Sequence, residues 1–421
     1  MVIGYILPES FPFFGTPIPV YICSDCQEII LPNKTSLPID PRLNKYPGTC
    51  PNCKSSNVIG ETLVFDTWFT SSLTPDINNN HPKNGKLSGK MYPMTMRPQA
   101  HDIIRTWALY TIIMGLLRHN DIPWRDLMIS GHILLKKGEK ISKKTGGGAH
   151  SPQELVAIYS SDVLRFAMCS STLGQDAYFD ESEVRGGQKL ITKLLNAGHF
   201  TLSNLSDFAH NQRFDEEKLE ASDRWILKMM KTTAHKMSQA FKIYEFAKAR
   251  QTFENFFWND FCDNYLEIVK GRLYGSDKKK RESAQIALYE AFLGILKMAS
   301  PFIPHITEEL YNENNYFLKS EGIKSIHLTL WPREDLKISG DLKDGARLMI
   351  LAVSEVRKYK SKKKMSLGAE ITSLKISAKD KERKLLEPFL EDLKAVTRTQ
   401  EIIFVNPKAT RSPNSELVIT L

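Results

Sequence analysis

The chain has 421 residues, more than a single hydrophobic core normally supports, so we expect two to four domains. Hydrophobic residues make up 42% and charged residues 25%, a composition typical of folded globular proteins and not of disordered ones. The net charge of +9 is compatible with a nucleic-acid partner without requiring one. The chain starts without a basic leader or a cleavage site, and its longest apolar stretch, LYTIIMGLL, is too short to span a bilayer. We therefore expect a cytoplasmic protein with no membrane partner.

Four of the six cysteines form two closely spaced pairs near the start of the chain. The sequence CSDC contains Cys23 and Cys26, and CPNC contains Cys50 and Cys53. Two such knuckles bring four thiolates together around one Zn²⁺, and four thiolates leave no open position for catalysis. The pattern therefore predicts a structural zinc site within a segment of short strands and turns over residues 1–65. The alternative is four unliganded thiols.

Residues 66–184 alternate apolar runs with loops, as an α/β unit does. The run HDIIRTWALYTIIMGLLRH predicts a helix that is apolar on most faces and therefore buried, and DLMISGHILL predicts an interior strand. Ser151, Pro152 and Glu154 have the spacing of a capping box, which predicts that a helix begins there.

Between that strand and that helix lies KGEKISKKTGGG, which combines four lysines with four glycines, three of them consecutive. Lysines supply mobile positive charges to a polyphosphate, and glycines let a loop close over it. The segment is not a Walker motif, because no GxxxxGK precedes a helix. Taken alone, it is equally well explained as a solvated surface loop.

The second half of the chain has a different pattern. Residues 185–335 carry long amphipathic segments that predict an all-α helix bundle, and residues 336–421 predict a small α+β module. A lysine-rich stretch, KYKSKKKMSLGAE, lies in this module. Its lysines suggest either a stripe of phosphate contacts or an ordinary solvated charge run.

Several motifs together resemble one enzyme family. KISKK resembles the KMSKS signature of class I aminoacyl-tRNA synthetases, with Ile141 and Lys144 as the two departures. VFDTWFTSSLTP, RPQAHDIIRTWA, STLGQDAYFDESEV and FFWNDFCDNYLEIVK follow the order and spacing found in valyl-tRNA synthetases, most like the archaeal-type branch. The resemblance extends from about Phe14 to Pro332.

The resemblance implies a fold and a set of ligands. It implies a Rossmann-like α/β nucleotide-binding half-domain with a zinc ribbon, followed by a helical anticodon-binding domain and the small α+β module. It implies valine, ATP with Mg²⁺ and tRNA(Val) as partners, alongside structural Zn²⁺.

The resemblance also implies roles for individual residues. Trp68 and Trp107 would line the active-site cleft, although a tryptophan in an apolar stretch is more often a core residue. Gln175 and Asp176 would stabilise the junction with the helical domain. The remaining implied contacts are Lys140, Ser142 and Lys143 as catalytic loop residues, His101, Asp102, Gly131, His132 and Lys143 at ATP or the adenylate, and Trp258, Lys358, Lys360, Lys362, Lys363 and Lys364 at tRNA.

One element of the family pattern is missing. We find no HIGH-like motif, whose histidines hold the same phosphates from the opposite side, and SGHIL lies too close to KISKK to serve as one. The editing domain is also absent. We therefore expect this chain to be the C-terminal portion of a larger enzyme, with a separate N-terminal half as one option, and to be inactive by itself. The alternatives are an isoleucine- or leucine-type synthetase, or a catalytically inactive zinc-ribbon module that binds tRNA.

Overall fold

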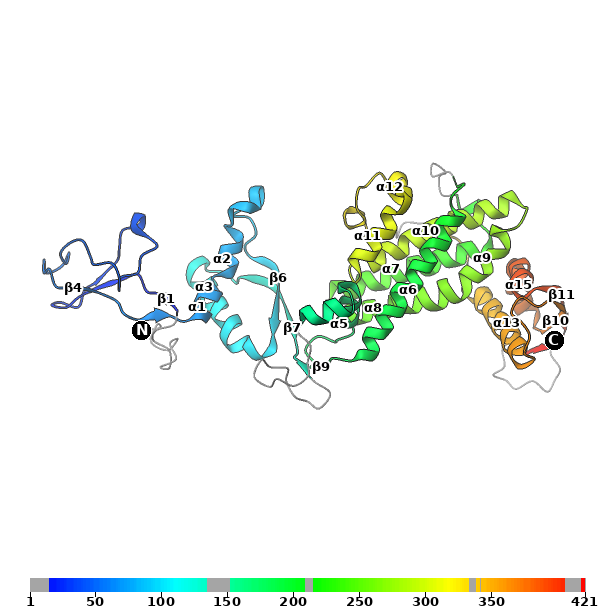
Figure 1. Cartoon of the computed structure of the whole chain (residues 1–421), viewed down its shortest axis with the longest axis horizontal. Helices are drawn as coiled ribbons and strands as arrows, with labels where there is room; N and C mark the ends of the chain where they lie inside the picture. The colour runs from blue at the N-terminus through cyan, green and yellow to red at the C-terminus, as the bar shows by residue number, and fades with distance from the viewer. Residues whose placement is uncertain are drawn as a thin grey trace. The chain divides into compact units, whose positions relative to one another are not determined.

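The computed structural model describes residues 15–134, 152–208, 215–332, 338–340, 342–405 and 418–420. The chain divides into two compact units, and Figure 1 follows the chain through both. The first unit comprises residues 1–132 together with 173–176, and the second comprises the remainder. None of the described helices combines the length and the apolar character needed to cross a membrane.

The first unit begins with a small antiparallel sheet around the paired cysteines. Its central strand alternates inward and outward side chains, so Tyr21 and Cys23 are buried together with Ile30 and Cys50. Four buried residues form a very small core, which is why a segment of this size needs an additional constraint. The elements of this segment are β1 (Thr16–Pro17), β2 (Tyr21–Cys23), β3 (Ile29–Ile30), η2 (Lys34–Ser36), β4 (Val58–Gly60) and β5 (Val64–Phe65), in sheets ordered β3-β2-β4 and β1-β5.

The rest of the first unit contains two parallel strands joined by a helix. The predicted helix exists, but the expectation that it is buried is wrong. Leu116 and Leu117 of α3 are 49% and 70% exposed, because the described residues cover only one side of this helix. The predicted interior strand ends at Ser130 and resumes after a break. The elements are α1 (Thr67–Ser72), α2 (Thr74–Asn79), η3 (Pro82–Leu87), β6 (Met94–Ala100), η4 (His101–Ile103), the π-helical turn η5 (Ile104–Ala108), α3 (Leu109–His119) and β7 (Trp124–Ser130).

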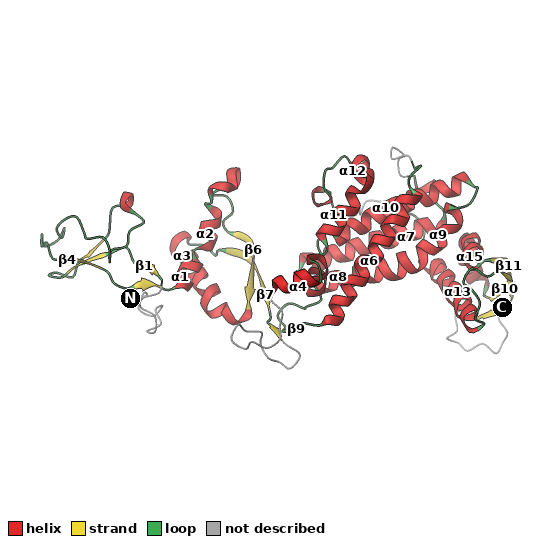
Figure 2. Ribbon diagram, in the orientation of Figure 1, coloured by secondary structure: helices red, strands yellow, loops and turns green. Residues whose placement is uncertain are grey.

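The second unit is mostly helical, as Figure 2 shows by colour. Its helices α6, α7, α8 and α10 pack against one another around one continuous hydrophobic core. Here the sequence pattern predicts the helices well, because each has one strongly apolar face. The elements are β8 (Ile133–Leu134), α4 (Pro152–Ile158), α5 (Ser161–Met168), β9 (Ala177–Tyr178), α6 (Glu181–Asn204), η6 (Glu216–Lys218), α7 (Ala221–Lys242), α8 (Phe246–Asn255), the π-helix η7 (Phe256–Tyr265), α9 (Leu266–Leu273), α10 (Lys278–Ala299), α11 (Pro304–Asn312), η8 (Glu313–Asn315), α12 (Tyr316–Glu321) and η9 (Ile326–Leu328).

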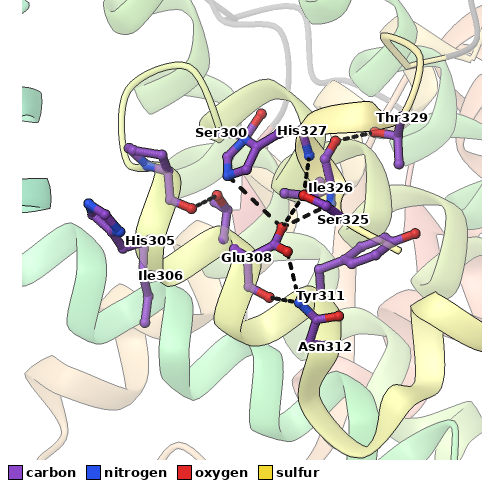
Figure 3. A network of polar contacts seen from close by, with 12 residues as sticks. Ser300, His305, Ile306, Glu308, Tyr311, Asn312, Ser325, Ile326, His327 and Thr329 are labelled. Carbon is purple, nitrogen blue, oxygen red and sulfur yellow. Dashed lines mark hydrogen bonds and ion pairs between the residues drawn. The ribbon is translucent and has the colours of Figure 1, made fainter. Parts of the chain in front are cut away.

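A polar network fixes the chain that leaves the last of these helices. The Glu308 carboxylate on α11 accepts hydrogen bonds from Ser325 Oγ at 3.0 Å and from the Ile326 backbone N–H at 2.9 Å (Figure 3). The Trp331 indole then donates to the Ala234 carbonyl oxygen on α7 at 3.2 Å. These contacts hold residues 325–331 against the bundle, although this segment contains no helix longer than one turn.

The C-terminal part of the second unit is a three-stranded sheet with helices. Strand β10 is central, parallel to β11 and antiparallel to β12. A buried ionic cluster joins this part to the bundle, since the Arg272 guanidinium contacts both Asp223 on α7 and Asp392 on α15, the latter at 2.9 Å. The elements are α13 (Lys343–Lys362), β10 (Ile371–Ser377), α14 (Asp380–Leu386), η10 (Glu387–Phe389), α15 (Leu390–Thr397), β11 (Thr399–Val405) and β12 (Val418–Thr420).

Candidate functional site

The four paired cysteines converge on one point. Their sulfur atoms all lie within 4.8 Å of one another, and the Cys23–Cys53 and Cys26–Cys50 Sγ–Sγ distances are both 3.5 Å. Sulfurs arranged tetrahedrally around Zn²⁺ at about 2.3 Å lie about 3.8 Å apart. The cluster therefore fits a four-thiolate zinc site.

Both knuckles have the same backbone geometry. In each, the first cysteine's carbonyl oxygen accepts a hydrogen bond from the N–H four residues later, at 2.8 Å from Gln27 and 2.9 Å from Lys54. Gln27 and Lys54 have φ values of 61° and 64°, the left-handed conformation that closes such a turn. The two halves of the site thus arise from identical local turns that the sheet brings face to face.

The protonation of these sulfurs is strongly coupled. The backbone N–H of Cys53, aided by that of Asn52, lowers the pKa of Cys50 to about 7. The backbone N–H of Ser55 favours the Cys53 thiolate, but the hydrogen bond with Cys26, burial and the other sulfurs outweigh it and raise the pKa of Cys53 to about 12. Four sulfurs this close repel one another once ionised, and a divalent cation removes that repulsion.

A second cluster lies where the parallel strands β6 and β7 end. The His101 and His132 rings meet edge to face with centroids 4.4 Å apart, and His132 Nε2 lies 3.7 Å from the Asp102 carboxylate. His101 Nδ1 lies 3.3 Å from the Ser130 carbonyl oxygen, so this nitrogen donates the hydrogen bond. The carboxyl ends of parallel strands are where α/β folds bind nucleotides. The structure therefore brings three of the sequence-predicted nucleotide contacts together.

Close backbone packing supports this cluster. A Cβ atom on Gly131 would lie 2.1 Å from the Gln175 carbonyl oxygen, so only glycine fits. The Asp176 carboxylate accepts a hydrogen bond from the His132 backbone N–H at 2.7 Å. Gln175 and Asp176 belong to the first unit and lie against Gly131 and His132, and their role at the junction with the helical domain stays a prediction.

The two predicted wall tryptophans are both half-buried. Trp68 lies on α1, and Asp66 caps this helix, because its carboxylate accepts a hydrogen bond from the Phe69 N–H at 2.7 Å. The Trp107 indole donates to the Ser71 carbonyl oxygen at 3.2 Å, so Trp107 is anchored to the same helix. No local sequence pattern indicates a role for Arg97, whose guanidinium carbon lies 3.6 Å from the centre of the Trp107 ring.

The predicted catalytic loop lies outside the described residues, and so do Lys140, Ser142 and Lys143. Its flanks are described: β8 precedes it and α4 follows, beginning at Pro152 as the capping pattern predicts. Strand β8 pairs in parallel with β9.

The residues predicted to contact tRNA have very different environments. Trp258 is half-buried against the bundle core, and Lys358 is exposed and paired with Glu355 at 2.7 Å. Lys362, Lys363 and Lys364 are exposed. Lys360 does not belong to this exposed stripe, because it is only 1% exposed and its ammonium group donates to the carbonyl oxygens of Leu367 and Thr397.

A cleft of about 1140 Å³ lies within the second unit, and Lys360 is one of its lining residues. Helices α9, α13 and α15 line it, and its lining carries both signs of charge, with a small excess of cations: Lys193, Lys270, Arg357, Lys360, Lys394 and Arg398 against Asp263, Glu267, Glu370 and Glu391. Tyr274 on its rim is 70% exposed. No sequence motif pointed to this cleft, because its residues come from four separate segments.

Comparisons with known families agree with this arrangement. Residues 12–180 match the family described as tRNA synthetases class I (I, L, M and V), and residues 223–376 match the anticodon-binding domain of tRNA ligase. These two matches show that the chain is similar to tRNA ligases in both the segment 12–180 and the segment 223–376.

The chain is also similar to valine–tRNA ligases. The enzyme of Ehrlichia ruminantium (strain Welgevonden) is 35% identical over 97% of this chain and 49% of its own length. Those of Picrophilus torridus and Methanocaldococcus jannaschii are 34% and 32% identical, over 97% and 94% of this chain and 50% and 44% of their own length. The resemblance expected from the sequence is thereby confirmed, and the chain spans about half the length of these relatives.

A solved structure shares the fold. The crystal structure of the Agrobacterium radiobacter K84 LeuRS–tRNA–LeuAMS ternary complex is similar with a TM-score of 0.61 at 18% sequence identity. The similarity covers 83% of this chain and 48% of that one.

Proposed function

We propose that this chain is part of a valine–tRNA ligase, the enzyme that activates valine with ATP and transfers it to tRNA(Val). The observation that carries the proposal is the 35% sequence identity to a valine–tRNA ligase over 97% of the chain. The aligned region includes both the segment that matches class I tRNA synthetases and the segment that matches the anticodon-binding domain. In the first step the valine carboxylate attacks the α-phosphate of ATP and pyrophosphate leaves. In the second, a ribose hydroxyl of tRNA attacks the valyl carbonyl carbon and AMP leaves.

In this proposal the first unit and the lysine loop bind Mg²⁺-ATP and valine. The exposed His101 and Asp102 and the half-buried His132 at the strand ends suit a nucleotide, and lysines suit its phosphates. Trp68 and Trp107 line the valine side. The residues proposed for the nucleotide are His101, Asp102, Gly131, His132, Lys140, Ser142 and Lys143.

We also propose the four-part organisation that the sequence suggests. Residues 1–65 form a zinc ribbon in which one structural Zn²⁺ replaces a larger core, since the four sulfurs fit the ion. Residues 66–184 form the Rossmann-like half-domain, 185–335 the anticodon-binding bundle and 336–421 the α+β module. The protein acts in the cytoplasm.

For tRNA we propose the face of the second unit that carries the cleft. The exposed lysines Lys358, Lys362, Lys363 and Lys364 at the end of α13 supply phosphate contacts, and Trp258 on the bundle is a further proposed contact. Lys360 is left out of the proposal because its ammonium group is already bonded inside the protein.

Catalysis by these residues requires a HIGH-type phosphate-binding element, which this sequence lacks. We propose that it comes from the remaining half of the synthetase, within a longer chain or as a second polypeptide. Valine-dependent ATP–pyrophosphate exchange is then expected only when a HIGH-bearing half is added, and Lys143→Ala abolishes it. Robust exchange by the 421 residues alone, or by the assembled Lys143→Ala variant, contradicts the proposal.

A catalytically inactive module that binds tRNA is the second candidate, because the sequence lacks the HIGH element. Filter binding separates the two: tRNA(Val) affinity without aminoacylation, even after the HIGH-bearing half is added, supports the binding module. An isoleucine- or leucine-type enzyme is not favoured, because the similar relatives are valine–tRNA ligases.

A further inference from the structure

Arg97 is a buried charge with few partners. It lies on β6 and is only 6% exposed. Its Nη1 donates to Thr111 Oγ1 at 3.0 Å, but Nε and Nη2 have no hydrogen-bond partner, and no ion pair to it exists among the described residues. Burial lowers the pKa of Arg97 to about 10, so the group is still charged at neutral pH. A buried charge without a counterion lowers the stability of the fold, so another interaction must stabilise the charged guanidinium at this position.

Two indole rings take the place of the counterion. The Arg97 guanidinium carbon lies 3.6 Å from the centre of the Trp107 ring and 4.8 Å from that of Trp124. The face of an indole carries partial negative charge and attracts a cation, more strongly where water is excluded. The shorter distance makes Trp107 the main partner.

Trp107 is held on its other sides as well. Its indole N–H donates to the Ser71 carbonyl oxygen on α1, and its own carbonyl oxygen accepts a hydrogen bond from Thr111 Oγ1 at 2.6 Å. Thr111 therefore contacts both Arg97 and Trp107. The ring also sits on the π-helical turn Ile104–Ala108, a rare geometry that is frequent at functional sites. Arg97 is the only one of these partners that contacts the ring face.

We propose that Arg97 is a positioning residue, whose guanidinium holds the Trp107 ring in the orientation that the valine pocket requires. The inference rests on the proposed role of Trp107 as a wall of that pocket. A residue present only for packing would be better apolar at this buried position, because methionine fills similar volume without a buried charge. Arg97 therefore acts through Trp107, and neither its charge nor its planar shape is dispensable.

The first test uses the chain as it is, and compares Arg97→Met, Arg97→Lys and the control Arg125→Met, an exposed arginine on β7. The readouts are the melting temperature and the hydrogen exchange of the Trp107 indole N–H, assigned with Trp107→Phe. In Arg97→Met we expect at least tenfold faster indole exchange with an equal or higher melting temperature. Arg97→Lys, which keeps a cation, should retain part of the protection, and the control should match the wild type. Unchanged exchange in Arg97→Met overturns the inference, as does faster exchange that only follows a lower melting temperature.

The second test uses the chain assembled with a HIGH-bearing synthetase half. In Arg97→Met the KM for valine should rise at least tenfold while kcat changes less than twofold, and Arg97→Lys should restore part of the loss. An unchanged KM, or a loss confined to kcat in proportion to unfolded protein, overturns the inference. If the wild-type assembly shows no valine-dependent exchange, the proposed function fails, and the indole exchange still decides whether Arg97 holds Trp107.

Discussion

Asp260 lies half-buried on the π-helix Phe256–Tyr265, and no cation contacts its carboxylate among the described residues. Burial raises the pKa of Asp260 from 3.8 to about 6. Each tenfold change in proton affinity corresponds to about 1.4 kcal/mol, so this rise amounts to ~3 kcal/mol. The folded state prefers the protonated form, so this stabilisation is present below pH 3.8 and is lost as the pH rises through about 6.

We predict that Asp260→Asn removes this dependence. The amide has the same shape and no charge, so at pH 8 the variant should be more stable than the wild type by up to about 3 kcal/mol, and at pH 4 nearly equal to it. Urea unfolding of the helical part, followed by tryptophan fluorescence between pH 4 and pH 8, measures the difference. Asp263→Asn, which changes an exposed carboxylate on the same helix, controls for the change in net charge. An Asp260→Asn difference that is the same at pH 4 and pH 8 would refute the reasoning.

Three further outcomes follow from the same structure. Treatment with a strong chelator, or Cys50→Ser, should release about one equivalent of zinc and unfold the small sheet around it, which metal analysis and circular dichroism detect; a chain that contains no zinc as purified contradicts the site. Arg272→Met should destabilise the second unit by about 3–5 kcal/mol, because it leaves Asp223, which is 0% exposed, without its cation, and urea unfolding measures the loss. Lys364→Ala should weaken tRNA(Val) binding and reduce the salt dependence of that binding, whereas Lys360→Met should lower stability and leave tRNA binding unchanged. Equal effects of the two variants on the salt dependence of binding would contradict the distinction between the exposed Lys364 and the buried Lys360.

Local patterns predicted the elements whose cause is local. The cluster of four cysteines follows from two turns with the same hydrogen bond, so the spacing of the cysteines was enough to predict it. The helices of the second unit follow from their apolar faces, and the start of α4 follows from the capping pattern before it. In each case the residues that determine the structure lie within one or two turns of each other.

Lys360 shows how a local pattern can be overridden. Five lysines in one stretch suggest a solvated surface, yet Lys360 follows the buried Val353 and Val356 by seven and four residues on α13. Helical periodicity therefore places it on the buried face, and the α15 carbonyl at Thr397 gives its ammonium group an acceptor. The periodicity was visible in the sequence, but the acceptor on a distant helix was not.

Long-range contacts were out of reach of the sequence. Arg97 and Trp107 lie on different elements, and nothing local indicates that a strand arginine will rest on an indole. The exposure of Leu117 depends on how many layers cover α3, which a single helix pattern does not encode. The cleft beside α15 is likewise assembled from segments up to two hundred residues apart.

The missing side chain at position 131 has a consequence for comparing sequences. The Gln175 carbonyl oxygen occupies the space where any Cβ would stand, so even alanine must push the 174–176 segment away and loosen the Asp176 bond to His132. A homologue that lacks this glycine can still be similar in sequence over the whole chain and yet no longer bring its strand ends together. Position 131 thus offers a one-residue criterion for separating intact members of the lineage from degenerate copies.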